Sequence, residues 1–176
     1  MPPPEDRTTP AEDAVDAATR QWKQAWPELD VQPGEVLARI HHLGQLIEKV
    51  QNQRLRRRPG MPVDNLGDFD VLRTLRRAGA PYALTPGQIR QAMLVSSAGL
   101  SGRLKRLEAT GWINRTASPH DARSVLVALT PEGLADLDRD LPEHYAFEDG
   151  LLEVLSADER GELARALRSL ILSTEG

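Results

Sequence analysis

The sequence contains no cysteine, and no apolar run approaches the roughly 20 residues needed to cross a bilayer. Without cysteine the chain cannot form disulfides, use a thiolate nucleophile or build the common cysteine-based zinc sites. The first ten residues, MPPPEDRTTP, lack the basic segment and the apolar segment of a secretory signal. We therefore expect a soluble cytoplasmic protein that has no association with a membrane.

The residues that are present have the proportions of an ordinary globular protein. Of 176 residues, 40% are hydrophobic and 27% are charged, which predicts one domain, or one domain with appendages. The net charge of -4 is unevenly distributed, because residues 1–30 and 131–176 are acidic and residues 31–130 are rich in lysine and arginine. A basic middle between acidic ends favours a nucleic-acid surface beside a separate interaction region, and a local fluctuation of charge is the alternative.

Caps, prolines and hydrophobic spacing predict a mainly helical chain. Pro10 should open the first helix with Thr9 as its cap, and Ser96 or Ser97 should cap the helix that ends at Thr110. Pro142 should bend or interrupt a long acidic helix. The expected helices cover residues 10–26, 33–57, 64–78, 86–93 and 97–110, and the expected strands cover residues 112–116 and 124–129. Two further helices should open at Thr130-Pro131-Glu132 and at the capping box Ser156-Ala157-Asp158-Glu159.

The central order of helix, short helix, helix, strand, polar loop and strand predicts a winged helix-turn-helix. In this motif the second helix enters the major groove, and the hairpin wing reaches phosphates or the minor groove. Leu100, Leu104 and Leu107 fall on one inward stripe of that second helix. The opposite side is small near its start and basic further on, which suits a helix that must approach DNA closely. An amphipathic surface helix with solvated charges is the alternative.

Eight residues are therefore candidates for contact with double-stranded DNA. On the helix and its cap they are Ser96, Ser97, Ala98, Ser101, Lys105 and Arg106, and at the tip of the wing they are His120 and Arg123. Serine can bond base edges or phosphates, and lysine and arginine neutralise phosphates.

Residues 84–133 resemble the DNA-binding core of the multiple-antibiotic-resistance regulator (MarR) family. The wing pattern Asp121-Ala122-Arg123-Ser124, followed by a strand and Leu129-Thr130-Pro131-Glu132-Gly133, is the strongest part. Trp112-Ile113-Asn114 departs from the family pattern in one strand. Other matching residues are Leu84-Thr85-Pro86, Ser96-Ser97-Ala98-Gly99-Leu100, Arg103-Leu104-Lys105-Arg106-Leu107-Glu108 and Gly111-Trp112-Ile113-Asn114-Arg115.

With its flanking helices the resemblance covers about residues 33–174. It implies an α+β fold that is mainly helical with a small hairpin wing. It also implies a homodimer whose terminal helices intertwine, with each winged domain reading half of a pseudo-palindrome. We expect a disordered tail at residues 1–9 and N-terminal helices at 10–62 that contribute to the effector site and to dimerisation. A DNA-binding domain should follow at 63–130, and C-terminal dimerisation helices at 131–176.

Arg103 is the candidate for an effector site, because the helical wheel places it beside the apolar stripe. A charge at that position is costly unless it is paired or its head reaches solvent. Asp70, in the preceding long helix, is the candidate partner, and a solvent-reaching Arg103 is the alternative.

The extra N-terminal helix resembles the urate-responsive branch of the MarR family. That branch binds its effector through a tryptophan, an aspartate and two arginines, which correspond by position to Trp22, Asp70, Arg103 and Arg115. Trp26 competes with Trp22 for the first of these roles. The resemblance implies a small organic anion, with urate as the first candidate.

The predicted function is that of a transcription regulator, a repressor that releases its operator when the anion binds. We expect no enzyme, no cofactor and no metal, since His41 and His42 are adjacent and cannot form a metal pair on one helix face, and no Gly-rich phosphate loop is present. The alternative is a dimeric helical interaction module with the same fold but without DNA binding.

Overall fold

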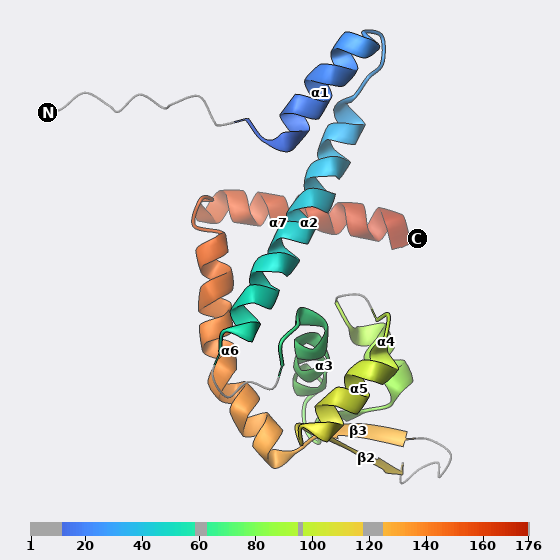
Figure 1. Cartoon of the computed structure of the whole chain (residues 1–176), viewed down its shortest axis with the longest axis vertical. Coiled ribbons are helices and arrows are strands. Elements are labelled where there is room, and N and C mark those ends of the chain that lie inside the picture. The colour runs from blue at the N-terminus through green and yellow to red at the C-terminus, as the bar shows by residue number, and fades with distance from the viewer. Residues whose placement is uncertain (1–11, 59–62, 95–96, 118–124, 176) are drawn as a thin grey trace, which may run out of the picture. The chain divides into compact units, whose positions relative to one another are not determined.

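The computed structural model describes residues 12–58, 63–94, 97–117 and 125–175, and the chain divides into two compact units. The first unit is Met1–Leu66 and the second is Gly67–Gly176. Figure 1 traces the elements of each unit along the chain.

The first unit is a pair of helices, α1 (Ala14–Ala25) and α2 (Gln32–Arg56). The predicted start of the first helix at Pro10 is wrong, because Asp13 caps α1: its carboxylate accepts the backbone N–H groups of Val15 and Asp16. The Asp16 carboxylate accepts the Asp13 N–H in return, which completes a capping box and fixes the start of the helix. Thr9 lies outside the described residues. Pro33 lies in the first turn of α2, as predicted.

Arg39 joins the two helices of the first unit. Its guanidinium lies 2.9 Å from the Asp13 carboxylate and 2.6 Å from that of Asp16. The pKa of Asp13 lies below its ordinary value, chiefly because the Asp16 N–H donates to its carboxylate and then because Arg39 does. The start of α1 is therefore held against α2 by charge as well as by the buried Val15.

The second unit contains the predicted succession of helices and strands. Its helices are α3 (Leu66–Arg77), α4 (Pro86–Ala92), α5 (Leu100–Ala109), α6 (Pro131–Leu151) and α7 (Ala157–Glu175). Thr85 and Gln88 form a capping box at the start of α4, and Thr130 caps α6. Pro142 does not interrupt α6, which continues across it.

The sheet of the second unit has three antiparallel strands in the order β1-β3-β2. The hairpin of β2 (Ile113–Ala117) and β3 (Val125–Leu129) was expected, and its register pairs Ile113 with Leu129 and Ala117 with Val125. The two-residue β1 (Ala83–Leu84) was not expected and pairs with β3. Figure 1 shows β2 and β3 projecting from the end of α5. The architecture is mainly helical with a small β wing, as the sequence predicted.

The core of the second unit lies between α3, α4, α5 and the sheet. Leu100, Leu104 and Leu107 are buried, which confirms the predicted inward stripe of α5. They share the interior with Phe69, Leu72, Leu75, Ile89, Val127 and Leu137. This packing holds the opposite side of α5 outward.

Candidate nucleic-acid interface and effector site

The second helix of the predicted motif, α5, begins later than expected. Gly99, at φ 73°, precedes the first helical residue, Leu100, and no side chain caps the helix. The serine cap is therefore wrong as a prediction: the Leu100 N–H donates to the Ser97 carbonyl, and the chain turns through a left-handed Gly99. Ser97 and Ala98 lie in the turn before α5, with Ala98 exposed.

The outward side of α5 carries small and basic groups. Ser101, Gly102 and Lys105 are exposed, one helical turn separating Ser101 from Lys105. With Ala98 in the preceding turn, they form a surface of small residues from which the Lys105 side chain extends. We call Ala98, Ser101, Gly102 and Lys105 the recognition face.

Arg106, which the sequence predicts as a phosphate contact, pairs with Asp68 in the structure. Its Nη2 donates to Asp68 Oδ1 at 2.7 Å and its Nε donates to Asp68 Oδ2 at 3.0 Å. Asp68 is only 3% exposed, so this two-pronged pair anchors α5 to the first turn of α3. The Arg106 side chain is still 58% exposed. The sequence analysis did not identify Asp68, although this acidic residue falls in the first turn of an expected helix.

The Arg103 guanidinium occupies the space beside Gly67, which has no side chain. A Cβ on Gly67 would lie 2.3 Å from the Arg103 Cζ, so the guanidinium lies directly against the start of α3. Gly67 therefore makes room for a half-buried arginine beside the apolar stripe. Arg103 and Arg106 both meet the first turn of α3, one through close packing and one through an ion pair.

Asp70 is fully buried on α3 and holds the end of α4. Its Oδ2 accepts the Leu94 backbone N–H at 2.9 Å, while its Oδ1 lies 3.5 Å from Arg73 and 3.7 Å from Arg77. Leu94 lies just after α4, on the way to the recognition face. The predicted pair of Asp70 with Arg103 stays a prediction.

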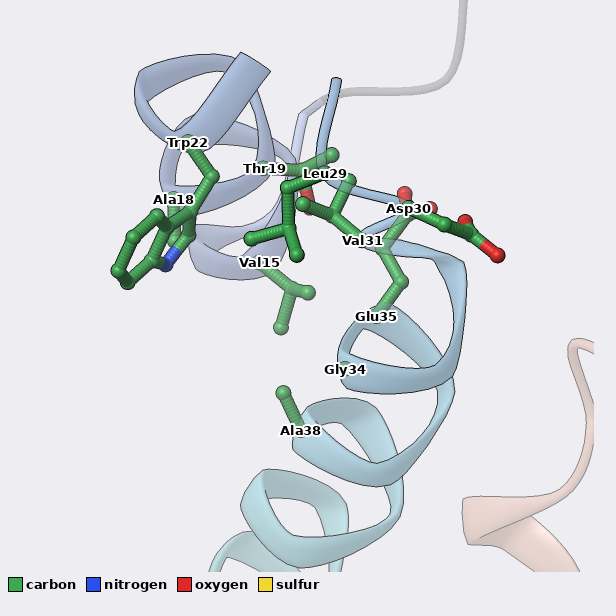
Figure 2. A pocket seen from close by; sticks show the side chains of 10 residues that line it. All are labelled: Val15, Ala18, Thr19, Trp22, Leu29, Asp30, Val31, Gly34, Glu35 and Ala38. Atoms are coloured by element: carbon green, nitrogen blue, oxygen red, sulfur yellow. The ribbon is translucent and has the colours of Figure 1, made fainter. Parts of the chain in front are cut away.

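The other two effector candidates lie in different units. Arg115, on β2, pairs with Glu108 of α5 at 3.1 Å. Trp22, on α1 of the first unit, lines a pocket of about 300 Å³ between α1 and α2, and Trp26 is not among the lining residues (Figure 2). That pocket has apolar walls from Val15, Leu29 and other residues, and its charged lining groups, Asp30 and Glu35, are acidic. Within the first unit, therefore, the lining provides no cation for an anionic effector.

Three predicted DNA contacts, Ser96, His120 and Arg123, lie outside the described residues. The strands that flank residues 118–124, β2 and β3, pair as an antiparallel hairpin. Over the described ranges, no cluster of metal-ligating side chains is found, and no helix is long and apolar enough to cross a membrane.

A short helix, a turn, an outward-facing helix and a β hairpin define the second unit as a winged helix-turn-helix of the DNA-binding class. Comparison with known proteins gives the family. A family model described as MarR family matches residues 60–124. The regulator PecS of Dickeya dadantii is 37% identical over 153 residues, which cover 87% of this chain and 89% of PecS. The chain belongs to the MarR family of transcriptional regulators.

Two solved structures are similar over most of their length. A MarR variant from Escherichia coli complexed with operator DNA matches with a TM-score of 0.65 and 26% identity, covering 85% of this chain and 96% of that one. BpsR of Bordetella bronchiseptica, whose DNA binding is regulated by 6-hydroxynicotinic acid, matches with a TM-score of 0.62 and 25% identity, covering 74% and 91%. Proteins of this family are transcriptional regulators and not enzymes.

Proposed function

We propose that the chain is a repressor that binds a pseudo-palindromic operator as a homodimer and releases it when a small organic anion binds. The observation that carries the DNA-binding part is the recognition face, which α3 holds outward through the Asp68–Arg106 pair. Ser97, Ala98, Ser101, Lys105 and Arg106 would meet the major groove, with Ser96 at the turn and His120 and Arg123 at the wing.

The exposed apolar side chains of the terminal helices support a dimer. In the described part of α7 no residue is buried, yet the helix carries Leu163, Leu170, Ile171 and Leu172, all exposed. On α2, Val36, Leu37 and Leu43 are also exposed. Apolar surface of this extent is unusual on a monomer and is normally covered by a partner, which we take to be a second copy of the chain.

The proposed effector site combines Trp22, Asp70, Arg103 and Arg115, with urate as the first candidate ligand. The similarity to BpsR supports an organic anion as the class of effector. The proposed switch is an exchange of charge, in which the anion competes for the guanidinium of Arg103 and repels the Asp70 carboxylate. At an effective dielectric near 20, two charges about 4 Å apart interact by roughly 4 kcal/mol before desolvation, which exceeds the usual allosteric coupling of about 1–3 kcal/mol.

Selection from a random pool of duplexes tests the DNA-binding part. The purified chain should enrich a pseudo-palindrome whose half-sites lie about one helical turn apart, because a two-fold dimer places two copies of α5 on one side of the DNA. Binding to the selected duplex should weaken steeply with salt, since lysine and arginine displace counterions from the phosphates. A pool that shows no enrichment at low salt would leave only the interaction-module alternative.

A further inference from the structure

The guanidinium of Arg106 is held from the protein side along one of its edges. Nε and Nη2 form that edge, and they donate to the two oxygens of Asp68 at 3.0 and 2.7 Å. Asp68 lies in the first turn of α3 beside the fully buried Phe69, so the core fixes the position of the carboxylate. The pair therefore sets the plane and the direction of an arginine whose side chain is otherwise largely exposed.

The opposite end of the same guanidinium lies over the recognition face. Gly102 is one helical turn before Arg106, and a Cβ at Gly102 would lie 3.6 Å from Arg106 Nη1. This placement follows from α-helical geometry, because long side chains point back over the preceding turn. Nη1 and the second N–H of Nη2 form the other edge of the planar group, which is directed away from Asp68. Two parallel N–H groups are thus presented beside the small residues of the recognition face.

A fork of this kind matches one base edge in particular. Guanine presents O6 and N7 side by side in the major groove, and an arginine can bind both through two parallel N–H groups. A phosphate makes no such demand, because a flexible lysine neutralises it from many directions. Asp68 also balances the charge of Arg106, which weakens the attraction to a phosphate and preserves the hydrogen-bonding geometry.

We propose that Arg106 binds a guanine in each half-site of the operator and that Asp68 is its positioning residue, an inference that rests on the proposed function. Lys105 then supplies affinity through a phosphate, and Arg106 supplies discrimination between bases. Because Asp68 orders the arginine before DNA binds, less rotamer freedom is lost when the complex forms.

Base replacement in the selected duplex tests the contact with guanine. Each guanine of one half-site is replaced in turn by adenine, with thymine opposite, and by 7-deazaguanine, which keeps O6 and lacks the N7 acceptor. At one position adenine should weaken binding by about tenfold, because it presents an amino group where guanine presents O6. At the same position 7-deazaguanine should weaken binding by about threefold or more. Fluorescence anisotropy measures both affinities.

Arg106→Lys assigns the sensitive guanine to Arg106. Lysine keeps the positive charge and lacks the planar fork. In this variant 7-deazaguanine should change the affinity by less than about twofold, and adenine should be accepted nearly as well as guanine. Arg165→Lys, the same change at an exposed residue of α7, should keep the wild-type preference.

Asp68→Asn tests the positioning role. The variant keeps Arg106 and removes the carboxylate that orients it, so the preference for guanine over adenine should fall by about threefold or more. Affinity for an unrelated duplex should rise and depend more steeply on salt, because Arg106 can then pair with a phosphate. A merely structural role for Asp68 would instead lower the affinity for all duplexes together. Asp64→Asn, at an exposed residue shortly before α3, should bind like the wild type.

A selected half-site in which no guanine responds to either replacement would overturn the inference. So would an effect of 7-deazaguanine that persists in Arg106→Lys, and both results are independent of whether Asp68→Asn folds. An unchanged preference for guanine in folded Asp68→Asn would overturn the positioning role. A chain that selects no duplex at all would refute the proposed function, whereas a selected duplex without a sensitive guanine refutes only the role given to Arg106.

Discussion

Replacing Lys105 with glutamate should weaken binding of the selected duplex by about 100-fold or more and make the binding less dependent on salt. Lys105 is exposed on the recognition face of α5, one turn after Ser101, and it is the one lysine on that face. The substitution removes a positive charge from the phosphates and adds a negative one in each half-site of the proposed dimer, so the effect counts twice. Fluorescence anisotropy across a range of salt concentrations measures both quantities.

Two further variants distinguish direct contact with DNA from a role in positioning α5. Lys49→Glu makes the same change of charge at an exposed residue of α2 and should bind the duplex nearly like the wild type. Arg106→Gln should lower both duplex affinity and melting temperature, because Arg106 also anchors α5 to Asp68. Lys105→Glu should leave the melting temperature unchanged. Equal duplex affinities for Lys105→Glu and Lys49→Glu would show that the recognition face is wrongly placed.

Gly133→Ala should destabilise the second unit by about 3 kcal/mol, the upper part of the range for overpacking in a well-packed site. Gly133 is buried in the first turn of α6, and a Cβ there would lie 2.4 Å from the Trp112 carbonyl oxygen. The obstacle is backbone at the start of the wing, so no side chain can rotate away to make room. For a chain of this size the melting temperature should fall by roughly 6–12 °C in a thermal unfolding experiment.

Gly150→Ala on the same helix is the matched control. Nothing lies within 4 Å of a Cβ at Gly150, and alanine favours a helix more than glycine by up to about 1 kcal/mol. Its melting temperature should therefore stay the same or rise slightly. If Gly133→Ala and Gly150→Ala have the same melting temperature, the contact between α6 and the wing is looser than the structure indicates.

Local signals in the sequence predicted most of the fold. Thr85-Pro86 and Thr130-Pro131 were recognised as helix starts, and the leucine spacing of α5 gave its buried side. The start of α5 was missed because a serine is normally the better cap, whereas here the turn requires the left-handed conformation of Gly99. The strand β1 was missed because its two residues become a strand only through pairing with β3, more than 40 residues away.

The candidate site was less accessible to prediction because its partners meet only in the folded chain. The helical wheel placed Arg103 beside the apolar stripe, but the space that Gly67 leaves for it could not be read from spacing. The wheel placed Arg106 on the outer side without revealing its pair with Asp68. Asp70 was identified as important, while its bond to the Leu94 N–H depends on how α4 ends.

Titration of urate into the complex of the chain with its selected duplex tests the central claim, that an organic anion controls DNA binding. We expect urate to release the duplex, and adenine, a planar ring system without the negative charge, to leave it bound. Arg103→Ala and Trp22→Phe should shift the release to urate concentrations about tenfold higher, since one removes the guanidinium and the other the indole N–H. Retention of the duplex at every concentration of urate and related anions, or release from both variants at the wild-type concentration, would contradict the account.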